Sequence, residues 1–241
     1  MRSGLILADS LAFARPKHGV LLENTWPYLL QNYTNDFLIY RANGGAMSNT
    51  LVDEANQIRS YYHKENLDKT FDWCVVQVGI VDCSPRKIST RLNYLIQKFI
   101  PNGAQIIRRI NRSNLFKKQM KPWISLDQFR NNINNIHLAL QPMCSNIFFI
   151  EIAPPCHNLI LNCGDFSQEV YKYNSVLKEL MNDKHLTPFS SNDDLEKSFL
   201  PDGHHLTKRG HKLVANSIIE SMSLGTQSIA NNVGDIKFLI N

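Results

Sequence analysis

Four short apolar runs, each ended by glycine, proline or a polar residue, most constrain what this chain can fold into. They cover residues 4–10, 36–41, 72–79 and 146–153. Continuous apolar character over so few residues is typical of strands buried on both faces of a parallel sheet. A shorter strand is expected at residues 185–189. The pattern therefore predicts an α/β protein built on a parallel sheet.

Segments with helical spacing separate these runs. At 241 residues, with 43% of them hydrophobic, the chain suits one domain with a large core. Within it, residues 101–125 are a candidate basic insertion or lid, and residues 223–241 a C-terminal extension that could form an edge strand, a docking segment or a dimer contact. We expect helices at residues 24–33 (with Asn24 as the cap), 48–62, 88–100, 126–140, 165–180 and 208–222, and a basic helix or mobile segment at residues 105–121.

A hydroxyl stands at the end of the first apolar run. Ser10 follows Asp9 there, and ligands of open parallel sheets bind at the carboxyl ends of strands. A serine needs a base to become a nucleophile, and Asp202 and His205 near the other end could supply a carboxylate and an imidazole side by side. Taken singly, each motif also fits a plain structural role: a turn or helix cap for Asp-Ser, and a polar loop for Asp-x-x-His.

Four motifs taken together resemble the blocks of the SGNH (GDSL-type) hydrolase family. They are the Ala-Asp-Ser-Leu of residues 8–11, Gly45, the Gly-Ile-Val-Asp of residues 79–82, and Asp202-x-x-His205. The resemblance spans nearly the whole chain. It implies a flavodoxin-like, three-layer α/β/α sandwich with a central, mostly parallel five-stranded sheet. It also implies that Ser10 is the nucleophile, that Asp202 and His205 are its partners, and that the amides of Ser10 and Gly45 form the oxyanion hole.

Two positions depart from the family pattern. Ala8 replaces a glycine, which is a mild change, whereas Val81 replaces the asparagine that completes the oxyanion hole. Losing one such donor typically costs about 10²–10³ in rate. An ionised Asp82 cannot replace it, because a carboxylate only accepts hydrogen bonds. The enzyme could therefore be slower, could use Arg86 or a backbone amide of residues 80–82 as a substitute, or could have lost hydrolysis.

Several other residues are candidates for the site or for a metal. Arg15, in a loop expected over the site, could hold a substrate anion or cap the sheet edge, and Asp82 and Arg86 are further substrate-binding candidates. Cys83 beside Asp82 is more simply a small buried side chain than a reactive thiol. Cys156, His157 and Cys163 match no standard zinc spacing, so neither a metal nor a cofactor is expected. Of the two adjacent histidines, His204 lies outside the family register.

The charge and the cysteine content of the chain limit which binding partners and which cellular compartment we expect for the protein. The net charge is +5, and residues 108–121 hold six of the basic residues. This run could meet an anionic glycan, a nucleotide-linked donor, a membrane surface or nucleic acid, but a solvated face is the favoured interpretation, and no nucleic-acid motif accompanies it. No apolar run approaches the roughly 20 residues of a membrane span. Five cysteines without a Cys-x-x-Cys pair, and a strand that begins almost at the first residue, predict a cytoplasmic protein.

The resemblance implies a function in acyl chemistry. The run of residues 79–86 resembles a variant found in SGNH proteins of bacterial surface-polysaccharide pathways. We therefore expect a serine-dependent acyl ester hydrolase or O-acyltransferase that acts on O-acetyl groups of a carbohydrate, either such a polysaccharide or its precursor. The alternative is a catalytically weak SGNH-fold protein that binds a glycan or assists polysaccharide biosynthesis. Its partners would be the acylated carbohydrate, together with a second copy of the chain or enzymes of the same pathway.

Overall fold

A five-stranded sheet forms the centre of the molecule. The computed structural model describes residues 3–65, 71–86, 88–112, 121–163, 165–189 and 192–226. Within these residues the strand order is β2-β1-β3-β4-β5, and every pairing is parallel, so the expected mostly parallel sheet is wholly parallel here. The strands are β1 (Ser3–Ala8), β2 (Phe37–Ala42), β3 (Trp73–Gln77), β4 (Ile147–Ile150) and β5 (His185–Leu186).

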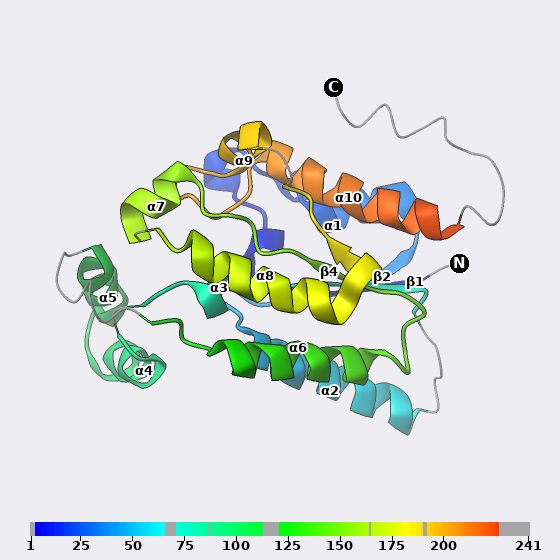
Figure 1. Ribbon diagram of the computed structural model, residues 1–241, viewed down its shortest axis with the longest axis horizontal. Coiled ribbons are helices and arrows are strands. Elements are labelled where there is room, and N and C mark those ends of the chain that lie inside the picture. Colours follow the sequence, from blue (N-terminus) through cyan, green and yellow to red (C-terminus); the bar gives the residue numbers. More distant parts are fainter. Residues whose placement is uncertain are drawn as a thin grey trace.

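Helices cover both faces of the sheet, which confirms the three-layer α/β/α sandwich (Figure 1). Helices α1 (Trp26–Thr34) and α10 (Lys208–Thr226) pack together on one face. The other face carries α2 (Ser48–Lys64), α6 (Leu126–Leu140) and α8 (Ser167–Met181). The core lies between these layers. Leu5, Ile6 and Leu7 of β1 are fully buried, as the unbroken apolar run predicts for a strand with helices on both sides.

The start of α1 differs from the expectation. Asn24 ends a short 3₁₀ turn (Leu22–Asn24), and its side-chain oxygen accepts a hydrogen bond from the Leu21 amide (3.1 Å). Helix α1 begins two residues later, and the Trp26 amide donates to His211 Nδ1 (3.2 Å). The prediction of Asn24 as the helix cap was therefore wrong, because a buried histidine of α10 satisfies this amide instead.

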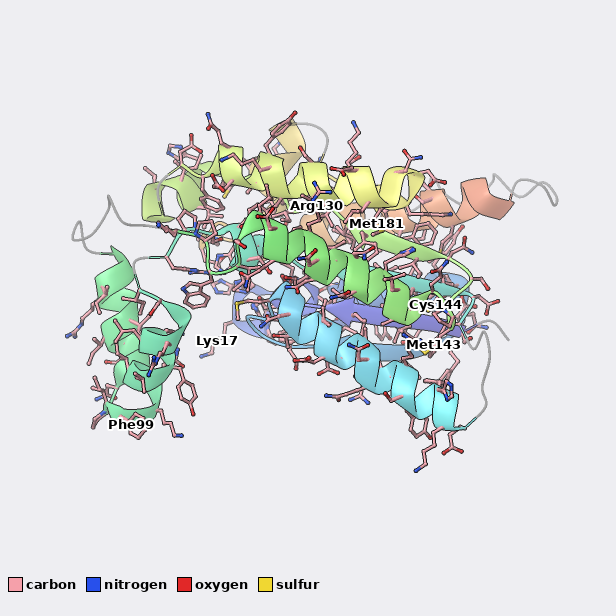
Figure 2. All side chains as sticks on the ribbon, turned by 60° about the horizontal axis from the view of Figure 1, so that its bottom comes forward. Lys17, Phe99, Arg130, Met143, Cys144 and Met181 are labelled. Carbon is pink, nitrogen blue, oxygen red and sulfur yellow. The ribbon has the colours of Figure 1, made fainter. Side chains whose placement is uncertain are left out.

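The connection from β3 to β4 leaves the body of the sandwich before it returns as α6. It begins with the short helix α3 (Ile80–Cys83) and continues through α4 (Thr90–Phe99) and α5 (Gly103–Arg112). Helices α4 and α5 form a pair that projects from one end of the molecule in both views (Figures 1 and 2). The expected lid region thus begins as a helix, while residues 113–120 lie outside the described part of the chain.

The remaining helices close the end of the sandwich that carries the carboxyl ends of the strands. They are α7 (His157–Cys163) and α9 (Asn192–Ser198), the second of which leads into the loop before α10. Residues 227–241, most of the expected C-terminal extension, lie outside the described residues. No helix in the described part of the chain is both long and apolar enough to cross a bilayer.

Candidate active site

Ser10 stands where the topology of the sheet opens a crevice. The chain runs from β1 to β2 on one side, and β3 lies on the other side of β1, so the neighbouring connections diverge at the end of β1. Ser10 begins a 3₁₀ turn (Ser10–Ala12) there, and Asp9 caps this turn by accepting a hydrogen bond from the Leu11 amide (2.9 Å). The turn directs the Ser10 hydroxyl to 3.2 Å from His205 Nε2.

His205 comes from the loop between α9 and α10, 195 residues further along the chain. Its Nδ1 lies 2.6 Å from Asp202 Oδ2, and Asp202 Oδ1 accepts hydrogen bonds from the amides of His204 (3.1 Å) and His205 (3.0 Å). An Nδ1–H donated to the carboxylate leaves Nε2 as the acceptor that faces Ser10. Ser10, His205 and Asp202 are therefore in contact in the order that a catalytic triad requires.

The charge on Asp202 is stabilised by these same contacts. Burial alone would raise the pKa of its carboxyl group. The hydrogen bonds from the His205 side chain and from the amides of His205 and His204 outweigh burial and hold the pKa well below its usual range. The carboxylate consequently stays ionised at neutral pH and can hold the His205 ring in position.

A tight turn shapes the loop that carries Asp202 and His205. Gly203 has a φ of +83°, and a Cβ added to it would lie 2.5 Å from the Leu159 amide nitrogen. The Gly203 carbonyl lies 3.2 Å from Sγ of the buried Cys156, which precedes α7. Only glycine fits this turn, because the backbone is left-handed and α7 packs against it.

A cavity of about 570 Å³ opens beside Ser10 and His205. It lies between the carboxyl end of the sheet and the projecting pair of helices α4 and α5. Its walls are mainly apolar and carry a few amide, hydroxyl and cationic groups, as is typical of small-molecule sites. The lining residues are Ser10, Gly45, Ile80, Val81, Ser84, Arg86, Asn93, Gln97, Ile107, Trp123, Leu159, His204 and His205.

The candidate oxyanion hole is made from backbone. Gly45 lines the cavity with a φ of +73°, a conformation that favours glycine. Among the described residues, no hydrogen-bond acceptor occupies the amide of Gly45 or of Ser10. Val81 also lines the cavity, but with an alkyl side chain that cannot donate a hydrogen bond. The side-chain donor that the family pattern places here is thus absent, as expected from the sequence.

Asp82 does not belong to the cavity wall, which corrects its prediction as a substrate-binding residue. Its side chain is fully buried and accepts hydrogen bonds from the Ser48 amide (2.9 Å) and the Ser48 hydroxyl (2.5 Å). The Asn132 side-chain amide lies 2.8 Å from the same hydroxyl. Burial raises the pKa of Asp82, and the Ser48 contacts oppose the rise. Asp82 therefore joins the loop carrying Val81 to the start of α2, three residues after Gly45.

Arg15 likewise supports the site from outside the cavity. Its guanidinium donates to the carbonyls of Ser10 (3.3 Å) and Ala14 (3.2 Å) and lies 5.8 Å from the centre of the Phe13 ring. It therefore holds the turn that carries Ser10 instead of lining the cavity, and its prediction as a substrate-binding residue is corrected. Of the three candidates for substrate binding, Arg86 alone lines the cavity.

Two acids and a thiol, Asp9, Glu151 and Cys83, have strongly altered pKa values. Asp9 is fully buried, and burial, together with the nearby Asp82, raises its pKa to about 7 although the Leu11 amide opposes the rise. Burial also raises the pKa of Cys83, so its thiol stays protonated in the core. Cys83 is thus a buried structural residue, in line with the favoured interpretation. The third group, Glu151 after β4, has its pKa raised to about 7 by burial.

The chain offers one group of side chains with the spacing of metal ligands among its described residues. These are Asp202, His204 and His205, whose ligand atoms lie within 4.8 Å of one another. The Asp202 carboxylate is already committed to His205 and to two amides, so this group fits a triad better than a metal site. Of the residues considered for zinc, Cys156 contacts the Gly203 carbonyl, and the side chain of Cys163 lies outside the described residues.

The part of the cavity wall that comes from the long connection was not found from the sequence. Asn93 and Gln97 of α4, Ile107 of α5, and Trp123 come from the long connection, and no motif marks them. The available signal was indirect: a connection of this length between two strands is typical of a lid or recognition element. That argument indicates the segment but not which of its faces meets the site.

Solved structures place this arrangement among known folds. An esterase, EstA, from Pseudoalteromonas sp. aligns over 94% of this chain and 100% of its own (TM-score 0.59, 14% identity). A carbohydrate acetylesterase family member from Sinorhizobium meliloti aligns over 93% and 100% (TM-score 0.57, 15% identity). A G-D-S-L family protein from Desulfitobacterium hafniense aligns over 92% and 99% (TM-score 0.54, 13% identity).

Comparison by sequence gives no further assignment, since neither a protein-family model nor a curated protein matches the chain. The structural likeness nevertheless extends over nearly the full length of each protein compared. The parallel five-stranded sheet between two helical layers matches the α/β/α sandwich of these proteins. The chain therefore has the α/β/α fold of the SGNH (GDSL-type) hydrolases.

Proposed function

We propose that this protein is a serine-dependent acyl ester hydrolase or O-acyltransferase that acts on O-acyl groups, O-acetyl above all, of a carbohydrate. The observation that carries this proposal is the contact of the Ser10 hydroxyl with His205 Nε2 (3.2 Å), with Asp202 behind the imidazole (2.6 Å). Each group has the position that its role demands, although the residues come from opposite ends of the chain.

The reaction follows from the positions of these groups. Ser10 Oγ attacks the acyl carbonyl while His205 Nε2 takes its proton, and the amides of Ser10 and Gly45 stabilise the oxyanion that forms. The bond to the sugar oxygen then breaks, and His205 gives its proton to that leaving oxygen. Water or a second sugar hydroxyl, deprotonated by His205, next attacks the acyl-serine. The bond from the acyl carbon to Ser10 Oγ then breaks, and His205 returns the proton to Oγ. Water yields a hydrolase, and a sugar hydroxyl yields a transferase.

Two observations support a carbohydrate as the substrate. The cavity of about 570 Å³ is far larger than an acetyl group needs, and its wall carries the side-chain amides of Asn93 and Gln97 beside the aromatic ring of Trp123. Among the structural neighbours is a carbohydrate acetylesterase family member. The run of residues 79–86, similar to that of SGNH proteins of surface-polysaccharide pathways, favours such a polysaccharide or its precursor.

The test of the triad is the turnover of p-nitrophenyl acetate by Ser10→Ala and His205→Ala. We expect each variant to lose about 10³-fold or more in kcat/KM, because nucleophile and base act as one unit. His63→Ala, an exposed histidine of α2 far from the triad in sequence, is the matched control and keeps the wild-type rate. Activity that survives both triad substitutions within a few-fold contradicts the assignment.

The second candidate function is glycan binding without efficient catalysis. Val81 favours it, because the side-chain donor of the oxyanion hole is missing. A fluorophosphonate probe separates the two: covalent labelling of wild type but not of Ser10→Ala supports an activated serine. Absence of labelling, combined with binding of an acetylated glycan, favours the binding protein.

A further inference from the structure

Arg86 is fixed in the wall of the cavity by its own neighbours. Its amide donates to the Lys121 carbonyl (3.0 Å), and the Lys121 amide returns a bond to the Arg86 carbonyl (3.4 Å). The guanidinium carbon lies 5.2 Å from the centre of the Trp123 ring, whose Nε1 donates to the Ile88 carbonyl (2.8 Å). Both the backbone of Arg86 and the aromatic surface beneath its guanidinium are therefore held in place.

Apart from Arg86, the polar side chains among the described lining residues are hydroxyls, amides and imidazoles. None of the described residues that line the cavity is an aspartate or a glutamate. The other polar groups are the hydroxyls of Ser10 and Ser84, the amides of Asn93 and Gln97, and the two imidazoles. Burial lowers the pKa of His204, and the neighbouring His205 and Arg86 lower it further, against the opposing effect of Asp202. His204 is thus neutral at pH 7, and Arg86 carries the permanent charge in the wall.

The connection that follows Asp82 is strongly one-sided in charge. Between Asp82 and Asp127 the chain contains ten lysines and arginines and no acidic residue. Since the whole chain has 26 basic and 21 acidic residues, the rest of it has 16 and 21, a net charge of −5. This connection therefore supplies all of the positive net charge, and its helices α4 and α5 border the cavity through Asn93, Gln97 and Ile107. A cation in the wall of a concave site raises the local concentration of ligands of the opposite sign.

We propose that the substrate is an O-acyl sugar that also carries an anionic group, a carboxylate or a phosphate, and that Arg86 binds this anion while Ser10 attacks the ester. The inference rests on the proposed function for the ester and extends it to the class of sugar. A guanidinium presents a planar fork of N–H groups that matches a carboxylate or phosphate bidentately, and the Trp123 ring leaves that fork pre-oriented. Asn93 and Gln97 are placed to bind hydroxyls of the same sugar.

The test compares three esters that differ in charge: an O-acetylated methyl glucuronoside, an O-acetylated glucose 1-phosphate and an O-acetylated methyl glucoside. For the wild type we expect kcat/KM to be about ten- to a hundredfold higher for one anionic ester than for the neutral one, as is typical of a single charge-assisted contact. Whichever anionic ester is preferred tells a uronic acid from a sugar phosphate. Equal kcat/KM for all three esters overturns the proposal.

Variants of Arg86 assign the preference to this residue. Arg86→Gln should bring the ratio of anionic to neutral kcat/KM close to one, mainly through KM, and Arg86→Lys should leave an intermediate ratio because it keeps the charge without the fork. Arg91→Gln, which removes one charge from an exposed position of α4 outside the cavity lining, is the matched control and keeps the wild-type ratio. If Arg86→Gln slows all three esters by the same factor, Arg86 serves the oxyanion or the fold, and the proposal fails.

Binding to Ser10→Ala separates this inference from the proposed hydrolysis. Titration of that variant with methyl glucuronoside, glucose 1-phosphate and methyl glucoside reports on the cavity without any turnover. Preferential binding of an anionic sugar, lost in Ser10→Ala/Arg86→Gln, supports the anion site even if no ester is ever cleaved. Turnover of p-nitrophenyl acetate without preferential binding or cleavage of any anionic sugar leaves the hydrolase standing and removes the anion site.

Discussion

Single buried polar side chains hold the candidate oxyanion loops in register. The Asp82 carboxylate accepts both the amide and the hydroxyl of Ser48, and so ties the segment carrying Val81 to the segment that follows Gly45. Burying a carboxylate carries a desolvation cost, and hydrogen bonds to the carboxylate offset this cost. The same hydrogen bonds fix the positions of the segments that they join. The backbone donors of the site can therefore be rigid although the side-chain donor has been replaced by valine.

Restoring that donor tests how much of the site is intact. Val81→Asn places an amide on the cavity wall, and we expect kcat for p-nitrophenyl acetate to rise by up to about 10²–10³-fold if the missing donor limits the reaction. Ile80→Asn, at the adjacent wall position, serves as the control for added polarity. An unchanged or lower rate in Val81→Asn indicates a site that has been adapted to another purpose.

The loop between α9 and α10 is the element on which the geometry of the site depends. It is pinned at its base by the pairing of Phe199 with Leu206 and at its turn by Gly203, which packs against Leu159 of α7. The same α7 residue lines the cavity. Displacing this turn would therefore move Asp202 and His205 and change the cavity wall at the same time.

A pair of glycine substitutions tests this dependence. Gly203→Ala and Gly19→Ala both place a side chain on a left-handed backbone, at φ of +83° and +75°, and each should lose about 1 kcal/mol of unfolding free energy for that reason. Only at Gly203 would the new Cβ meet backbone, 2.5 Å from the Leu159 nitrogen, whereas at Gly19 nothing lies within 4 Å. We expect Gly203→Ala to lose further stability and at least tenfold in esterase rate, and Gly19→Ala to keep the rate.

Urea unfolding and p-nitrophenyl acetate turnover measured on the same preparations check both effects. Equal losses of stability in the two variants, with full activity in Gly203→Ala, would show that the turn tolerates the contact and does not position the triad.

The elements that could be predicted from the sequence are those whose signals are local. Buried parallel strands read as unbroken apolar runs, and α6 begins and ends where its spacing predicts, since Ser125 and Gln128 form a capping box at its start. The contact of Ser10 with His205 was also anticipated, from motif order. Asp82 and Arg15 were misplaced because a charged side chain reads as exposed until its buried partners, Ser48 and the Ser10 carbonyl, are known. The cavity wall depends on how α4 and α5 pack back toward the sheet, which has no local signal.

At the scale of the whole molecule, buried acids should make stability depend on pH. The pKa of Asp9 and the pKa of Glu151 are each raised to about 7, mainly by burial. Between their unfolded values near 4 and about pH 7 the folded state binds more protons than the unfolded state, so this contribution to stability falls as pH rises. His211 acts in the opposite direction, because burial lowers its pKa to about 4 and its contribution grows as pH rises from 4 to 6.5.

The Asp9→Asn variant isolates one of these opposing effects. The unfolding free energy of the variant minus that of wild type should increase by roughly 2–4 kcal/mol between pH 5 and pH 8. The reason is that the variant has no carboxyl group to ionise in the core. Urea titrations at the two pH values measure this difference. Asp53→Asn, which changes an exposed aspartate of α2, is the control, and its unfolding free energy should change with pH as that of wild type does. A pH-independent difference between Asp9→Asn and wild type would show that Asp9 is ionised throughout this range.

The 195-residue separation of Ser10 from His205 has a consequence for how activity arises during synthesis. A nascent chain can present its first strands and its serine early, but it lacks a base until the loop before α10 has left the ribosome and docked. Under the proposed function, esterase activity would therefore arise only after the end of the chain has folded onto its beginning.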